Sequence, residues 1–257
     1  VGNNNQATGG ASTAMGVSSI AKGEASVAIG NVAQATQIRA TAVGNRATAT
    51  QDSATAYGNR ANATGARATA IGSEANAIDY DATAVGSKAN ASVAAAVAVG
   101  NNASASAQSA IAVGQNAAAS GINTISIGMN TTATKDHGIA MGTSSKSLGV
   151  QSVGVGSFTE ATADSVVAVG QNAKAGGVAA PGGKGSGTAA VAVGYDANAS
   201  AANTFAGGKS ATASVDNAVA LGVQSNASAR TASALGGYSQ ASAERATAVG
   251  AASKASG

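Results

Sequence analysis

The chain has 257 residues, of which 2% are aromatic and 10% charged, with 35 glycines, one proline and no cysteine. This composition excludes disulfides, thiolate metal ligands and a core built from large side chains, which leaves alanine and valine to fill the interior. The net charge of +3 comes from 14 basic and 11 acidic residues spread thinly along the chain, so we expect no nucleic-acid partner. No apolar run approaches the roughly 18 residues of a membrane span.

A glycine recurs every 14 residues along almost the whole chain. The series runs from Gly2 to Gly170, resumes at Gly194 and ends at Gly250, so that 18 glycines bound 17 repeats. The one longer interval, of 24 residues, places ten additional residues near 176–185, around the only proline. This regularity predicts a single repeat domain, residues 1–257, with a loop insertion near 176–185.

Two short strands are predicted in each repeat, which we number so that the recurrent glycine is position 14. Positions 9–13 are rich in β-branched residues, and positions 2–6 carry alanine at alternate places. A helix is disfavoured, because glycine beside threonine and valine in every repeat would weaken it. We therefore expect an all-β fold in which each repeat forms one coil of a β-solenoid, with the glycine at a corner because it tolerates a positive φ.

The two sides of each strand carry different side chains. Position 12 is alanine in 15 of 17 repeats, with Ser126 and Gly154 as the exceptions. A coil of 14 residues is narrow, so we assign the small residues at positions 3, 5, 10 and 12 to its interior, which turns positions 11 and 13 outward. The aliphatic residues there would form an apolar stripe, and such a stripe marks an interface along which the chain oligomerises. The alternative places positions 11 and 13 inside and gives a monomer. The predicted interface residues at position 13 are Ile29, Val43, Ile71, Val85, Val99, Val113, Ile127, Val155, Val169, Val193, Leu221, Leu235 and Val249.

Other side chains recur at equal positions of successive coils. Arg60 and Glu74 share position 2, Arg67 and Asp81 share position 9, and asparagine recurs at position 4. Opposite charges one coil apart predict a solvated face, on which each ion pair stabilises the fold by only a few tenths of a kcal/mol, on the order of 0.3. The asparagines predict a hydrogen-bonded ladder. In the coil after the insertion, Phe205 stands at position 11 while Gly207 leaves position 13 empty, which predicts that the ring fills that space.

Catalytic chemistry is not expected. His137, the only histidine, lies in a polar turn without the partners of a triad or a zinc site. Two turn carboxylates, Asp79 and Asp81, fall short of a calcium site. We therefore expect no enzymatic activity, no metal and no cofactor. Exposed aromatic residues at turns are the candidate ligand contacts, namely Tyr80, Phe158, Tyr195 and Tyr238.

Four strand segments carry a family resemblance. The sequences NTISIG (123–128), NAVALG (217–222), SAIAVG (109–114) and SVVAVG (165–170) resemble the head repeats of YadA-like trimeric autotransporter adhesins. The matching motif residues are Asn123, Ile125, Ile127, Gly128, Asn217, Val219, Leu221 and Gly222. The resemblance implies a left-handed parallel β-roll in three copies, displayed on the outer membrane at the surface of a Gram-negative cell. It implies membrane attachment only through an anchor domain outside this chain, and collagen- or fibronectin-type matrix proteins or host cells as partners.

The function we favour is that of an adhesin head, which attaches a bacterium to host extracellular matrix or cells through a rigid trimeric β-roll. Repetition and copying would convert weak contacts into avidity. Ice binding by an Ala/Thr-rich solenoid is one alternative, because Thr41, Thr55, Thr69 and Thr83 form a row at position 11, although Val97 continues that row with an aliphatic side chain. A passive structural spacer is the other alternative.

Overall fold

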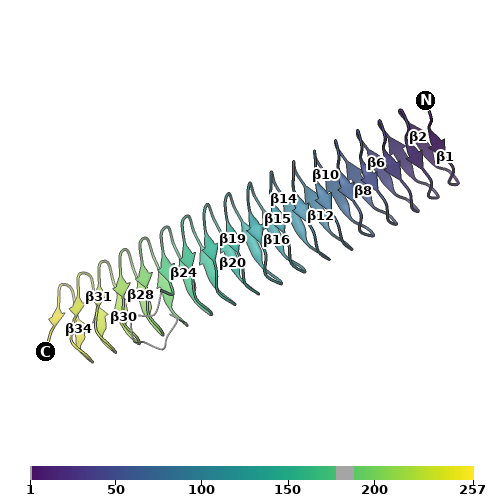
Figure 1. Ribbon diagram of the computed structural model, residues 1–257. Coiled ribbons are helices and arrows are strands. Elements are labelled where there is room, and N and C mark those ends of the chain that lie inside the picture. Colours follow the sequence, from purple (N-terminus) through teal and green to yellow (C-terminus); the bar gives the residue numbers. More distant parts are fainter. Residues whose placement is uncertain (1, 178–187) are drawn as a thin grey trace. The chain divides into compact units, whose positions relative to one another are not determined.

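The computed structural model describes residues 2–177 and 188–257, and these ranges contain strands and turns but no helix. The chain divides into two compact units, Val1–Asn123 and Thr124–Gly257. Each unit is a parallel β-solenoid in which a coil contributes one two-residue strand and one three-residue strand (Figure 1). The solenoid fold predicted from the repeat is confirmed. The prediction of a single domain remains untested, and the predicted insertion lies, apart from Gly176 and Gly177, outside the described residues.

Short strands alternate along both units. The two-residue strands of the first unit are β1 (Gln6–Ala7), β3 (Ile20–Ala21), β5 (Gln34–Ala35), β7 (Thr48–Ala49), β9 (Asn62–Ala63), β11 (Asn76–Ala77), β13 (Asn90–Ala91), β15 (Ser104–Ala105) and β17 (Ala118–Ala119). Its three-residue strands are β2 (Thr13–Met15), β4 (Val27–Ile29), β6 (Thr41–Val43), β8 (Thr55–Tyr57), β10 (Thr69–Ile71), β12 (Thr83–Val85), β14 (Val97–Val99) and β16 (Ile111–Val113). The two-residue strands of the second unit are β19 (Thr132–Ala133), β21 (Lys146–Ser147), β23 (Glu160–Ala161), β25 (Lys174–Ala175), β27 (Asn198–Ala199), β29 (Thr212–Ala213), β31 (Asn226–Ala227), β33 (Gln240–Ala241) and β35 (Lys254–Ala255). Its three-residue strands are β18 (Ile125–Ile127), β20 (Ile139–Met141), β22 (Val153–Val155), β24 (Val167–Val169), β26 (Val191–Val193), β28 (Phe205–Gly207), β30 (Val219–Leu221), β32 (Ser233–Leu235) and β34 (Thr247–Val249).

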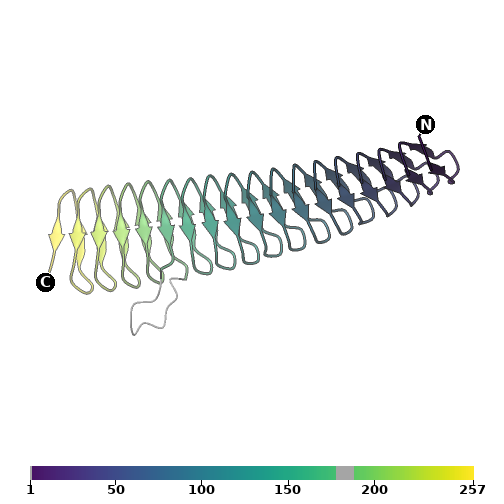
Figure 2. The ribbon, with the colours of Figure 1, turned by 45° about the horizontal axis from the view of Figure 1, so that its top comes forward.

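Each strand pairs in parallel with the equivalent strand of the next coil in the same unit. Strand β10 pairs with β12 so that Ala70 stands beside Ala84, and Ile71 stands beside Val85. Figure 2 shows equivalent strands of successive coils side by side within each unit. Since the register shift equals one repeat, any side chain that recurs in the sequence recurs as a row on the surface or in the interior.

Alanine fills the interior of both units. The described alanines at positions 3, 5, 10 and 12 are buried in almost every coil, for example Ala61, Ala63, Ala68 and Ala70 at 0% exposure. The interior assigned from the sequence is confirmed. The alternative that places positions 11 and 13 inside is wrong, because these side chains point outward and Ile71 is 40% exposed.

The strands are shorter than the sequence predicts. They occupy only positions 4–5 and 11–13, whereas the predicted spans were positions 2–6 and 9–13. The reason is that residues at positions 2 and 9 adopt a left-handed backbone in every described coil, as at Arg60 (φ 55°) and Arg67 (φ 58°). The chain turns at these places and cannot remain extended. The predicted glycine corner is confirmed, with φ of 138° at Gly58.

In the coil that follows the insertion, the side chain of Phe205 fills the space left on the outer face by Gly207. A Cβ atom placed on Gly207 would lie 2.7 Å from Cε1 of Phe205 and 2.9 Å from Cδ1 of Leu221. The phenyl ring therefore occupies the space that an aliphatic side chain fills in other coils, as the sequence predicts.

Candidate functional site

The outward face of the three-residue strands carries the predicted interface residues. Every one of them is the last residue of its strand, where parallel pairing sets Ile71 beside Val85 and Val85 beside Val99. Coils repeat at about 4.8 Å, so these side chains form a close-set row in each unit. The exposed fraction is 40% at Ile71, 49% at Leu221 and 67% at Val249, in the last three-residue strand. We call the outward side chains at positions 11 and 13 the aliphatic face.

The structure explains why the motif residues that carry the family resemblance occur at their positions. Asn217 has a left-handed φ of 58°, which asparagine tolerates better than most residues. Gly222 has a φ of 132°, a conformation almost confined to glycine. Between them, Val219 and Leu221 point outward from β30. The same holds for Asn123, Ile125, Ile127 and Gly128, whose end residues have φ of 55° and 129°. The motif thus specifies two turns and the aliphatic face.

The four candidate ligand-contact aromatics are exposed and lie in four different coils. Their exposed fractions are 46% for Tyr80, 53% for Phe158, 45% for Tyr195 and 58% for Tyr238. Tyr195 has the ammonium nitrogen of Lys209 5.8 Å from its ring centroid. The expectation of exposure is confirmed, whereas contact with a ligand stays a prediction.

Tyr80 belongs to a charged cluster on the first unit. The Nε and Nη2 atoms of Arg67 donate hydrogen bonds to the two carboxylate oxygens of Asp81, at 2.7 and 2.6 Å. The same guanidinium lies 4.0 Å from the centroid of the Tyr80 ring. The hydrogen bonds from Arg67 hold the pKa of Asp81 below its ordinary value, and those to Asp81 raise the pKa of Arg67. The predicted charge pairing is confirmed here, and also between Arg60 and Glu74 at 3.7 Å.

Asparagines also stack between coils. The side-chain amide of Asn62 donates to the Oδ1 atom of Asn76 at 3.5 Å, which confirms the predicted ladder for this pair. A second such pair, Asn102 to Asn116 at 3.0 Å, occurs at position 2. These contacts stabilise the outer surface between neighbouring coils.

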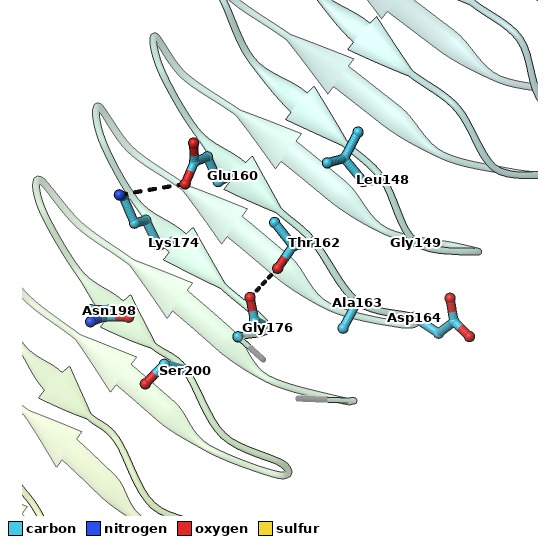
Figure 3. A pocket seen from close by; sticks show the side chains of 11 residues that line it. Leu148, Gly149, Glu160, Thr162, Ala163, Asp164, Lys174, Gly176, Asn198 and Ser200 are labelled. Carbon is cyan, nitrogen blue, oxygen red and sulfur yellow. Dashed lines mark hydrogen bonds and ion pairs between the residues drawn. The ribbon is translucent and has the colours of Figure 1, made fainter. Parts of the chain in front are cut away.

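The outward face of the two-residue strands in the second unit carries a charged row that was not predicted from the sequence. The carboxylate of Glu160 lies 3.6 Å from the ammonium of Lys146 and 3.4 Å from that of Lys174. Figure 3 shows Glu160 and Lys174 on this face, with Asn198 of the next coil beyond them. The row borders a hollow of about 580 Å³ that also includes Thr162, whose hydroxyl donates to the Gly176 carbonyl. Opposite charges at a spacing of 14 residues were the signal that could have found it.

Neither a metal centre nor a membrane helix is found in the part of the chain that the structure describes. Within residues 2–177 and 188–257, no three His, Cys, Asp or Glu side chains are grouped to hold a metal ion. His137 occupies a left-handed turn position with φ of 61°. No helix in the same ranges is long and apolar enough to cross a membrane.

The 14-residue coil with its outward aliphatic face defines the class of protein as a parallel β-solenoid. The family model of the YadA head domain repeat (2 copies) matches the chain in overlapping segments that together cover residues 7–33, 35–173 and 186–257. The chain therefore belongs to the YadA head family. The uncovered residues 174–185 include the whole of the predicted insertion near 176–185. A search of the curated proteins finds no match.

Proposed function

We propose that this chain is the head of a trimeric surface adhesin and that its three copies pack together through the aliphatic face. The YadA head family is trimeric and adhesive, which supports the proposal. In the same proposal, the head is displayed on the outer membrane of a Gram-negative bacterium. It attaches the cell, as a virulence factor, to collagen- or fibronectin-type matrix proteins or to host cells.

The aliphatic face is the observation that carries this proposal. Ile71 and Leu221 are 40% and 49% exposed in a single copy, although both are large aliphatic side chains. Soluble monomers rarely expose continuous apolar surface of this kind. Three copies that turn this face toward a common axis would remove it from water and leave the opposite, polar sheet of each coil accessible to ligands.

Attachment can be tested with the assembled protein on immobilised collagen, on fibronectin and on cultured host cells. We expect saturable binding that depends on assembly, because three linked copies gain avidity of about 10²–10⁴ over one. The variants Ile71→Asp and Leu221→Asp place a charge in the interface, and we expect them to dissociate the trimer and lose that avidity. Asn226→Asp, at position 4 on the other sheet, is the matched control and should bind as the original does. Absence of binding to all three surfaces by an intact trimer would refute the proposal.

Ice binding is the alternative that the threonine row supports. Thr41, Thr55, Thr69 and Thr83 stand in register one coil apart. They are half-buried, and they share the aliphatic face with Ile71. A trimer would cover these hydroxyls and prevent contact with ice. Thermal hysteresis at micromolar protein concentration would support ice binding over attachment.

A further inference from the structure

Three consecutive coils of the second unit present a mixed polar surface on the sheet opposite the aliphatic face. Strands β23, β25 and β27 pair in parallel, so that Glu160, Lys174 and Asn198 stand in one row. All three are the outward residues of their strands (Figure 3). The strands that carry these carboxylate, ammonium and amide side chains are about 4.8 Å apart, the spacing of the coils.

A second hollow, of about 530 Å³, lies along this row toward position 2 of the coils. Its volume falls within the range of small-ligand sites. Besides Ala197, it is lined by one aromatic ring and five hydrogen-bonding groups, namely Phe158, Glu160, Asn172, Lys174, Asp196 and Asn198. We call this the Phe158 hollow.

The aromatic ring is at a position where the backbone does not favour it. Phe158 has a left-handed φ of 59°, whereas Asn172 occupies the equivalent place of the next coil with φ of 57°. A bulky side chain in this conformation costs stability, and asparagine costs less. The ring is also 53% exposed, so it contributes little to packing. Packing within the chain therefore does not require an aromatic ring here, and the exposed ring is available to pack against a ligand.

Charge decides which ligand class fits. The lining groups Glu160, Lys174 and Asp196 carry a formal charge of −1 together. The ammonium of Lys174 lies 3.4 Å from the Glu160 carboxylate, which offsets its attraction for an anion. Sulfated and sialylated groups are disfavoured by this balance. A neutral polyol can donate hydroxyl hydrogens to the carboxylates and accept from the amides, and the C–H face of a pyranose ring packs on an exposed aromatic ring.

We propose that the Phe158 hollow binds a neutral saccharide. Phe158 packs against the apolar face of one sugar ring, and Asn172, Asp196 and Asn198 hydrogen-bond its hydroxyls. The inference gives the attachment function a ligand class and rests on that function. It places the contact on the sheet that the proposed trimer leaves accessible, and three copies would present three such sites.

The first test measures binding of the assembled protein to an array of neutral, sialylated and sulfated oligosaccharides. We expect binding to at least one neutral oligosaccharide, at least a tenfold loss in Phe158→Asn, and retention in Phe158→Tyr. Because asparagine suits the left-handed backbone, Phe158→Asn should not lower the melting temperature, which separates loss of contact from unfolding. Gln224→Asn, at the equivalent position of another coil, is the matched control. No binding to any neutral oligosaccharide, or equal binding by Phe158→Asn, would overturn the inference.

The second test separates this inference from the attachment function. Adhesion to immobilised matrix proteins is compared before and after periodate oxidation of their glycans. Loss of adhesion after oxidation and in Phe158→Asn is the expected result. Adhesion that survives both changes overturns the saccharide site and leaves attachment through protein contacts. Saccharide binding on the array without adhesion to untreated matrix or cells supports the site and overturns the attachment function.

Discussion

Gly58 faces the carbonyl group of Gly72 in the next coil so closely that a Cβ atom on Gly58 would lie 2.7 Å from the carbonyl carbon. Gly58 also has a φ of 138°, which other residues rarely adopt. Steric contact and backbone conformation thus both require glycine. We predict that Gly58→Ala lowers the free energy of unfolding by at least about 2 kcal/mol, measured by urea denaturation.

Substitutions at two other glycines distinguish the effect of steric contact from that of backbone conformation. Gly250 has a φ of 109°, but a Cβ atom added there would have no atom within 4 Å, so Gly250→Ala should show only the conformational cost. Gly237 has no positive φ, and its added Cβ would lie 3.8 Å from the Val223 carbonyl oxygen. Gly237→Ala should change the free energy of unfolding by less than about 0.5 kcal/mol. If Gly58→Ala and Gly237→Ala lowered the free energy of unfolding equally, the explanation by close contact between coils and by backbone conformation would be refuted.

Gly154 stands where most coils have an interior alanine, and the hydroxyl groups of Ser145 and Thr159 lie in the space that the alanine methyl group would fill. Ser145 donates a hydrogen bond to the Gly154 carbonyl at 2.9 Å and contacts the Thr159 hydroxyl. A Cβ on Gly154 would lie 2.9 Å from the Lys146 carbonyl oxygen and 3.1 Å from each of the two hydroxyl oxygens. We predict that Gly154→Ala costs about 1–2 kcal/mol by overpacking. With Ser145→Ala and Thr159→Ala already present, the same change should cost at least about 0.5 kcal/mol less in chemical denaturation. Strictly additive costs would contradict this account.

The Arg67–Asp81 pair predicts a pH effect in the acid range. Hydrogen bonds from Arg67 lower the pKa of Asp81 in the folded protein. The stabilisation is therefore present above the pKa that Asp81 has in the unfolded chain, and it is lost as the pH falls through the lower, folded value. A carboxyl NMR titration should show a lowered pKa for Asp81 that rises toward its ordinary value in Arg67→Gln. An unchanged titration in that variant would show that Arg67 is not the cause.

Much of the fold follows from the sequence because one coil contains few kinds of environment. Alanine at positions 3, 5, 10 and 12 identified the interior, since only small side chains fit between two strands this close. Glycine at position 14 identified a corner. The turns themselves were expected, but the left-handed backbone at positions 2 and 9, which shortens the strands, was not, because the residues there are diverse, as Arg60, Glu74 and Phe158 show. The asparagines that recur there were the available signal.

The candidate surfaces were less predictable than the interior. The aliphatic face followed from alternation along a strand and from the volume of alanine. The Phe158 hollow did not, because it depends on side chains of three coils that are separated in sequence and on how far each one extends. Lys146, Glu160 and Lys174 share one repeat position, which indicates a row but not the hollow beside it.

Oligomeric mass tests the central claim most directly. If the aliphatic face is an interface among three copies, sedimentation velocity at micromolar concentration should give a species of three times 23.8 kDa. Leu221→Asp should shift the mass toward that of one chain, since it places a charge in the interface. A stable species of 23.8 kDa for the unaltered protein, with no larger form at higher concentration, would contradict the account.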